Sequence, residues 1–333
     1  MADAAANPLL TRRRFLTTAA LAGGGAVVAG CSLPFSSSAE DAGANPSAGG
    51  APSSSTTSTP STSSTATAAS TASPIFGDSR SENMTITVAD GVRTIHTASW
   101  PDWSFDADFR YPGTPRKQDL TFRVTTDPQI AAQPTMVRTG QVFGVHRNSA
   151  VFDPTTAGYY GGRMGGAWNY NADALDTHGV HTRPDGFYHL HAVTPAWVSD
   201  PTAHSAFVGW AADGFPIYLR YGYVDPADPT SGVKDLQASY RLKAGSRPSG
   251  ADDPGGTYDG TYVADYEYVA GLGDLDECNG RWCVTPEYPD GTYAYFLTDA
   301  WPMVPHWIKG TPDPSFAPGV GGGSAPARGR QAA

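Results

Sequence analysis

Cysteine and positive charge are both scarce in this chain. Only three cysteines occur among 333 residues, and 22 Lys and Arg stand against 32 Asp and Glu, which gives a formal net charge of −10. An acidic chain without a basic cluster argues against nucleic acid as a partner. It also argues against electrostatic docking on anionic lipid, so any membrane attachment needs another device.

Several common motifs are missing as well. The chain has no Gly-x-Ser-x-Gly elbow, no His-Glu-x-x-His helix and no dinucleotide-binding fingerprint. The glycine-rich run at 158–166 lacks the Gly-Lys-Ser/Thr of a phosphate loop, so it is interpreted as an ordinary loop. Long amphipathic helical patterns are also lacking, which excludes a helical bundle.

Residues 1–30 are typical of an export signal. Thr-Arg-Arg-Arg-Phe-Leu at positions 11–16 matches a twin-arginine signal, and the apolar stretch 16–28 is too short and glycine-rich for a membrane span. The following Val-Ala-Gly-Cys resembles a lipobox that ends at Cys31; an ordinary cleaved signal with an incidental cysteine is the alternative. We expect an exported protein, anchored through lipid on Cys31 to the outer face of the cytoplasmic membrane.

Composition divides the rest of the chain into three parts. Residues 31–74 are mostly Ser, Thr, Ala, Pro and Gly, and such a segment cannot bury enough surface to offset its ordering entropy. We expect a disordered linker there and a similar disordered tail at 317–333. Residues 75–316 are long enough for one large domain or two small ones, and we expect a single domain.

Period-two alternation predicts that this domain is mainly β. Residues 84–88 and 92–96 alternate on either side of a turn containing Asp90 and Gly91. Further strands are expected at 120–124, 142–145, 207–210 and 262–269, and a turn or two of helix at 234–240. The predicted fold class is a sandwich-like β domain with long loops.

Histidines gather in one part of the domain. Five of the eight lie between positions 178 and 204, and His189 and His191 flank Leu190 within an expected strand. Alternate side chains of a strand share a face, so these two imidazoles are expected about 7 Å apart on one side. Imidazole suits zinc, copper, iron and nickel, which predicts a transition-metal site, with copper or zinc favoured.

The candidate site draws on seven residues. Three or four ligands with an open position would make a catalytic site, whereas a closed set would be structural. Carboxylates are included because they ligate metals or orient ligating histidines. Simpler interpretations stay open, since Asp213 precedes a glycine and is compatible with a tight turn, and His204 with a turn cap. The candidate residues are Asp176, His178, His181, His189, His191, His204 and Asp213.

A weak internal repeat bears on the two central histidines. Residues 185–194 resemble residues 290–298, and each segment begins with Asp-Gly and continues as an expected strand. In this alignment Tyr188 matches Tyr293, whereas His189 and His191 match Ala294 and Phe296. The same strand pattern is therefore built once without histidine, which weakens a purely structural role for the pair.

The segment Tyr188-His189-Leu190-His191 resembles the signature of the YHYH-domain family of bacterial exported proteins, with Leu190 in place of the second tyrosine. Further similar blocks lie at 213–218, 239–243, 275–280 and 285–293, so the resemblance covers roughly residues 140–311. It implies a family and a fold but carries no settled activity. The family tends to have Asp-x-Cys-Gly-Gly-His upstream, so His178 stands where a cysteine is usual.

Export and spacing predict a disulfide between Cys278 and Cys283, since disulfides persist outside the cytoplasm. A loop this small implies a modest stabilisation of about 2–3 kcal/mol. In the resembling family Cys278 is the recurrent cysteine, and its usual partner corresponds to His178, which makes Cys283 a rewired partner. Ligation of a soft metal by both thiols is the alternative, although two lone cysteines do not make a tetrahedral zinc site.

These features predict an extracytoplasmic, lipid-anchored metal-binding protein. The alternatives are a metal-assisted hydrolase or oxidase that acts on a cell-envelope substrate, and a module that binds an envelope carbohydrate or peptide. Chelation should abolish the first two functions and spare the third. The binding module would use stacking on surface tryptophans chosen from Trp168, Trp197, Trp210, Trp282, Trp301 and Trp307.

Overall fold

The structure is a computed structural model. It describes residues 82–156, 159–160, 163–167, 174–193, 197, 200–250 and 253–319. The predicted export signal, Cys31, the linker and all but the first residues of the predicted tail lie outside these ranges. No helix within the described ranges has the length and apolar character needed to cross a membrane.

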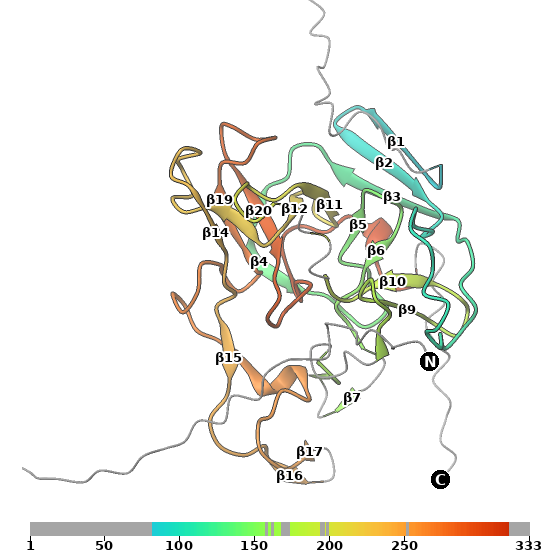
Figure 1. The fold of residues 1–333 in the computed structure, drawn as a ribbon, viewed down its shortest axis with the longest axis vertical. Helices are drawn as coiled ribbons and strands as arrows, with labels where there is room; N and C mark the ends of the chain where they lie inside the picture. Colours follow the sequence, from blue (N-terminus) through green and yellow to red (C-terminus); the bar gives the residue numbers. More distant parts are fainter. Residues whose placement is uncertain are drawn as a thin grey trace, which may run out of the picture. The chain divides into compact units, whose positions relative to one another are not determined.

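The described residues form a mainly β protein, which confirms the predicted fold class (Figure 1). Two 3₁₀ helices lie wholly within the described ranges, η4 (Val263–Asp265) and η5 (Pro314–Phe316). In chain order, the strands are β1 (Met84–Ala89), β2 (Val92–Thr97), β3 (Leu120–Thr125), β4 (Ile130–Met136), β5 (Gly144–His146), β6 (Val151–Phe152), β7 (Tyr159–Tyr160), β8 (Arg163–Met164), β9 (Val180–Thr182), β10 (Tyr188–Leu190), β11 (Phe207–Ala211), β12 (Pro216–Leu219), β13 (Tyr221–Tyr223), β14 (Val233–Asp235), β15 (Tyr240–Leu242), β16 (Ser249–Gly250), β17 (Asp253–Pro254), β18 (Tyr266–Tyr268), β19 (Gly280–Cys283), β20 (Thr292–Leu297) and β21 (Trp307–Gly310).

The antiparallel sheet β1-β2-β3 follows the sequence pattern closely. Asp90 and Gly91 both have positive φ, 51° and 72°, as a tight Asp-Gly hairpin turn requires. On β3 the side chains of Leu120, Phe122 and Val124 are buried and their neighbours are exposed or half-buried. Alternation therefore places one face of this sheet on the core, and these residues belong to the main hydrophobic cluster of the domain.

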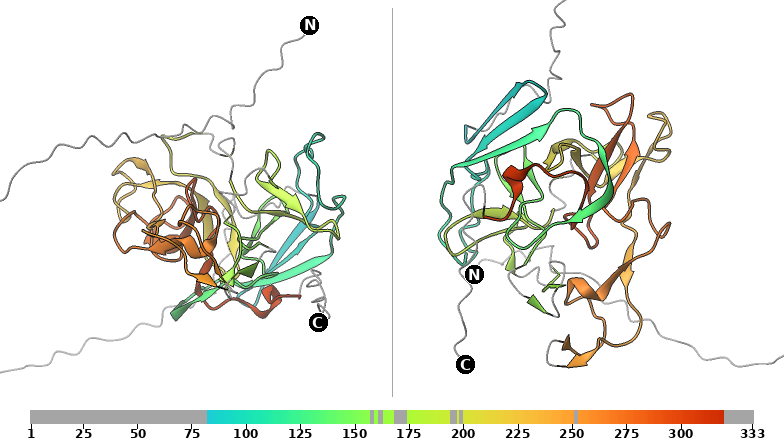
Figure 2. Two further views of the ribbon diagram at one scale, coloured as in Figure 1. Left: turned by 90° about the horizontal axis from the view of Figure 1, so that it is seen from below. Right: turned by 180° about the vertical axis from the view of Figure 1, so that it is seen from behind.

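The second large sheet has eight strands in the order β19-β20-β12-β11-β5-β6-β10-β9. Its pairings are symmetric about the centre: both edge pairs are antiparallel, the next pairs inward are parallel, and the remaining pairs are antiparallel. Val145 of β5 faces Trp210 of β11 at the centre. The guanidinium of Arg93 on β2 lies 4.3 Å from the Trp210 ring centroid, so the two sheets pack together there (Figure 2).

The symmetry divides the eight-stranded sheet into two arms. We call β5, β6, β9 and β10 the first arm, and β11, β12, β19 and β20 the second arm. In the first arm β10 runs parallel to β6 and antiparallel to β9, and in the second β20 runs parallel to β12 and antiparallel to β19. The repeat found in the sequence thus corresponds to β10 and β20, each of which follows an Asp-Gly turn.

The helix predicted at 234–240 is wrong, because this segment begins in the strand β14, ends at the start of β15 and connects the two through non-helical backbone at 236–239. Asp235 pairs with Tyr221 of β13, and Tyr240 pairs with Tyr268 of β18. Only Leu236 and Ser239 are buried, so the segment has no apolar helical face, and pairing with neighbouring strands satisfies its backbone instead. The strand predicted at 262–269 is shorter than expected, since η4 occupies its first half.

The predicted disulfide is also absent, since Cys278 and Cys283 are both free, buried thiols. The reason lies in the extended backbone between them. From Gly280 to Cys283 the chain is the strand β19, which advances about 10 Å over three residues. Bridged cysteines need Cα atoms within about 7 Å, so this extended segment keeps the thiols apart. Burial raises the pKa of both thiols, which keeps them protonated at neutral pH.

Candidate metal centre

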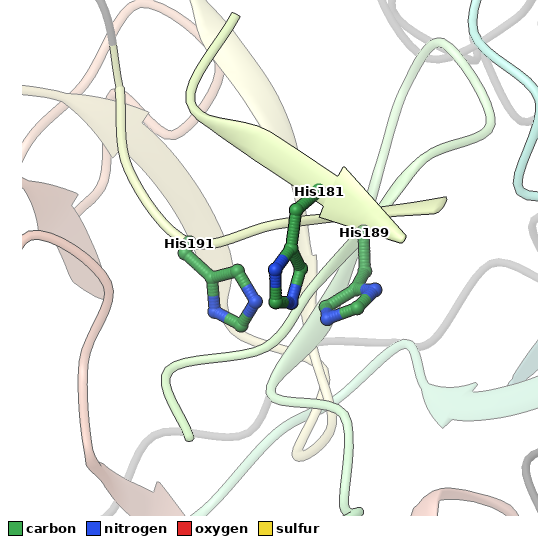
Figure 3. Close-up of side chains that lie close together, drawn as sticks. All are labelled: His181, His189 and His191. Carbon is green, nitrogen blue, oxygen red and sulfur yellow. The ribbon is translucent and has the colours of Figure 1, made fainter. Parts of the chain in front are cut away.

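Three imidazoles meet at the outer edge of the first arm, where β9 pairs with β10. His181 on β9 lies directly opposite His189 on β10, and His191 follows β10 by one residue. The ring centroids are 4.8 Å apart for His181 and His189, 4.7 Å for His181 and His191, and 4.5 Å for His189 and His191. Figure 3 shows the three rings gathered side by side. One potential ligand atom from each lies within 4.8 Å of the others.

Local backbone conformation explains why the strands meet in this register. The β9–β10 hairpin turns at Gly186, which has φ of 85°, and the preceding Asp185 accepts a hydrogen bond from the Phe187 N–H at 3.1 Å. Gly179 enters β9 with φ of 77°, and its carbonyl accepts a bond from the His191 N–H at 2.9 Å. A Cβ on Gly179 would lie 2.5 Å from the Ala192 carbonyl oxygen, so only glycine fits.

Burial keeps these imidazoles neutral. His189 and His191 are 2% and 1% exposed, and His181 is half-buried. Desolvation lowers the pKa of His181 to about 4, with a further decrease from the charge of Arg183. Burial lowers the pKa values of His189 and His191 well below the ordinary value of 6.5. At neutral pH all three are therefore neutral imidazoles with one unprotonated ring nitrogen, the form that binds metals.

A neighbouring carbonyl orients the His189 ring. The Nδ1 atom of His189 lies 2.9 Å from the Phe187 carbonyl oxygen, and the backbone of Asp153 acts to raise the pKa of His191. A ring that donates one N–H to a carbonyl presents its other nitrogen as an acceptor. The Phe187 carbonyl therefore makes Nε2 the acceptor nitrogen of the neutral His189 ring.

An ion pair that sequence reasoning missed lies beside the triad. Arg183 donates to Asp153 Oδ2 at 2.9 Å, and its guanidinium stacks 4.6 Å from the ring of Phe187. Phe187 in turn stacks on His189, with centroids 5.4 Å apart. Because Asp153 follows β6, parallel pairing of β6 with β10 brings it to the site. No local pattern around Asp153 could have indicated this contact.

Asp176 supports the site without joining the triad. Its Oδ1 accepts the N–H groups of His178 and Val180 at 2.9 and 3.0 Å, and its Oδ2 accepts the hydroxyls of Tyr111 and Tyr188 at 2.6 and 2.7 Å. These bonds fix the loop that leads into β9. Its negative charge also acts to raise the pKa of His181. This carboxylate therefore acts on His181 through the loop and its electric field.

The structure places the remaining predicted ligands elsewhere. His178 stacks on Trp103 with centroids 5.0 Å apart, and His204 packs against Tyr218 and Tyr223. Asp213 accepts hydrogen bonds from the Tyr295 hydroxyl and the Gly310 N–H at 2.5 and 2.8 Å. Among the described residues, the close group of possible ligands consists of His181, His189 and His191.

The tryptophans proposed as stacking platforms differ in how far they are exposed. Trp210 and Trp301 are buried, and Trp197 and Trp307 pack partly buried against the core. Trp168 lies outside the described residues. Trp282 alone among the other five is largely exposed, at 61%. Only Trp282 among these five therefore offers an open indole face.

The fold and the triad define a mainly-β protein with a three-histidine centre, two of its imidazoles buried and one half-buried, at one edge of its eight-stranded sheet. The chain belongs to the YHYH family: the family model described as "YHYH protein" matches residues 121–310, more than half of the chain. This confirms the resemblance seen in the sequence and extends it toward the N-terminus, to include most of β3. Family membership is consistent with an extracytoplasmic protein. No curated protein and no solved structure matches the chain.

Proposed function

We propose that this protein binds one transition-metal ion, copper or zinc, through His181, His189 and His191. The observation that carries this proposal is the meeting of three imidazoles whose ligand atoms lie within 4.8 Å of one another. Two nitrogens bound to one zinc ion at about 2.1 Å are separated by no more than about 4.2 Å. Small rotations of the rings are sufficient to close that difference.

The donor set favours a borderline metal over a hard one. Three neutral imidazoles supply nitrogen ligands, whereas calcium and magnesium require oxygen. His189 and His191 lie below the surface and His181 is half-buried, so solvent reaches the ion from the side of His181. In catalytic metal sites, three protein ligands leave a fourth coordination position that holds water, and here that position would lie on the side of His181. A metal-assisted hydrolase or oxidase acting on an envelope substrate is therefore the second candidate function.

Metal content of site variants tests the proposal. We expect His189→Ala and His191→Ala to lose the bound ion, since each removes one of three ligands. His306→Ala is the matched control, because His306 is also buried and lies outside the triad. Metal is measured in protein exported by its native route, after supplementation with copper or zinc. Parental stoichiometry in both triad variants, or no metal in the parent, would contradict the proposal.

We further propose that the mature chain is attached to the membrane through lipid on Cys31. The lipobox-like sequence and the twin-arginine pattern support this proposal. Cys31→Ser should move the protein from the membrane fraction to the soluble fraction, since the acidic chain has no basic cluster to hold it. Equal membrane association of the variant and the parent would show that another device anchors the protein.

A further inference from the structure

The two edge strands of the eight-stranded sheet, β9 and β19, differ in what covers them. On β9, Thr182 lies opposite Tyr188, and its hydroxyl donates to the Gly113 carbonyl at 2.6 Å while accepting the Gly113 N–H at 3.0 Å. The chain itself therefore covers this edge. On β19, Trp282 occupies the corresponding place opposite Tyr293, and its side chain is 61% exposed. A large aromatic ring in that position, open to solvent, presents a flat apolar face on which a ligand can stack.

A cavity of about 440 Å³ lies beside Trp282. This volume falls in the range of small-molecule sites. Trp282 and Tyr268 supply aromatic surface, and the exposed Gly271 leaves backbone open along the lining, since a Cβ there would meet nothing within 4 Å. The cavity is thus bordered by aromatic surface that includes the indole of Trp282.

Four charged side chains line the same cavity, and their charges balance. Lys309 pairs with Asp276 at 2.9 Å, and Asp274 pairs with Lys234 at 2.5 Å. Arg281 donates to the Tyr223 carbonyl at 2.6 Å. A charged ligand would have to compete with these existing partners. A neutral ligand with many hydroxyls would instead find acceptors and donors already held in place, which satisfies its polar groups without a net charge.

An extended peptide fits this edge less well. Addition of a strand needs a run of unoccupied backbone groups along the edge. The Gly280 carbonyl already accepts the Asp276 N–H at 2.9 Å, and the Gly280 N–H donates to the Asp276 carboxylate at 3.2 Å. Because β19 has only four residues, little edge is left for a peptide.

We propose that the cavity beside Trp282 binds a neutral saccharide, with a pyranose ring stacked on the indole. The apolar face of the ring covers Trp282, and its hydroxyls bond to Asp274, Asp276 and Lys309. This site is separate from the histidine triad, which lies at the opposite edge of the sheet. Saccharide binding and metal binding are therefore expected to be independent.

Titration with defined oligosaccharides tests the proposal. The probes are chitotriose, cellotriose and maltotriose, each up to about 10 mM, which covers dissociation constants in the millimolar range. The readouts are calorimetry and the indole N–H resonance of Trp282, assigned with Trp282→Phe. We expect one probe to bind the whole protein, a loss of at least about tenfold in affinity in Trp282→Ala, and a smaller loss in Trp282→Phe. Chelator should leave the affinity unchanged.

Val88→Ala is the control, since Val88 is 60% exposed on β1, in the other large sheet, and its truncation should change nothing. Absence of binding by all three probes would overturn the proposal, as would binding retained in Trp282→Ala. Saccharide binding that disappears with chelator would place the ligand at the triad instead. Failure here leaves the metal proposal standing, because metal content is measured separately.

Discussion

The two arms of the large sheet share one scaffold and differ in what they carry. Asp176 in the first arm and Asp276 in the second each accept two backbone N–H groups from the following loop and a hydroxyl from a strand tyrosine, Tyr188 or Tyr293. The loop then enters the edge strand through a residue with positive φ, Gly179 or Asn279. Both arms therefore use the same hydrogen-bonded frame.

The two arms differ in residue type at the three positions that carry imidazoles in the first arm. By strand register, His181 corresponds to Arg281 and His189 to Ala294. His191 corresponds to Phe296, because the N–H of each bonds to the carbonyl of the left-handed residue in its arm. In the second arm the Arg281 guanidinium lies 5.6 Å from the Phe296 ring centroid. In the second arm, side chains other than histidine pack at the three positions that carry imidazoles in the first arm. The fold itself therefore does not require imidazoles there.

Exchange of the three positions should produce the largest effect. His181→Arg, His189→Ala and His191→Phe together give the first arm the residues of the second. We expect bound metal to fall from one ion per chain to none, because no nitrogen ligand remains, while the β circular dichroism spectrum is kept. The reverse substitution of the second arm is a demanding control, since it tests whether the frame alone creates a site. Retained metal in the exchanged protein would remove the functional difference between the arms.

Acidification should affect the first arm more than the second, because the three imidazoles lie in the first arm. Protons compete with metal only near the pKa of the ligands, so metal occupancy should hold well below pH 6.5 and fall near pH 4, where His181 titrates. The metal-free protein behaves differently. The three histidines of the triad have folded pKa values below the unfolded value. Their contribution to the free energy of unfolding is therefore fully present above about pH 6.5 and is lost as the pH falls toward 4.

The measurement is chemical denaturation of the metal-free protein between pH 7 and pH 4, with the exchanged variant as control. Asp153, whose pKa burial raises, contributes with the opposite sign but is present in both proteins, so its effect largely cancels. The parent should lose more stability than the variant over this range. Identical pH profiles would mean that the imidazoles are not neutral and buried as described.

Removal of the charge from Asp176 and from Asp276 should lower the free energy of unfolding by different amounts. Asp176→Asn leaves the Tyr111 and Tyr188 hydroxyls facing an amide N–H₂ in a fully buried site, which should destabilise the domain by about 1–3 kcal/mol. Asp276→Asn keeps its Oδ1 acceptor and loses mainly the partly exposed Lys309 pair, about 0–1 kcal/mol. Urea unfolding of both variants measures the difference. Equal losses would contradict this assignment of their roles.

The smallest effect is expected from reductant. Because Cys278 and Cys283 are free thiols, dithiothreitol should leave the thermal midpoint of the exported protein unchanged. Alkylation after unfolding should label both cysteines in the unreduced protein. A midpoint that falls on reduction would show a bond that the extended β19 strand is expected to prevent.

Local sequence pattern was sufficient for much of the fold. The strands β1, β2, β3 and β11 were all expected from alternation or apolar runs, and the turn at Asp90 and Gly91 from its composition. These features depend on neighbours along the chain. The helix expected at 234–240 failed because that segment has no apolar face of its own, and pairing with β13 and β18 decides its conformation.

For the candidate site, the spacing of His189 and His191 was enough to place both on one face of a strand, since a period of two is a property of any strand. Only the tertiary structure selected His181 over His178 and His204 as the third imidazole, because the register between β9 and β10 places it opposite His189. Asp153 and Arg183 likewise meet the triad through pairing between strands distant in sequence. Which side chains converge depends on non-local register and burial, and neither is encoded in the spacing of a single strand.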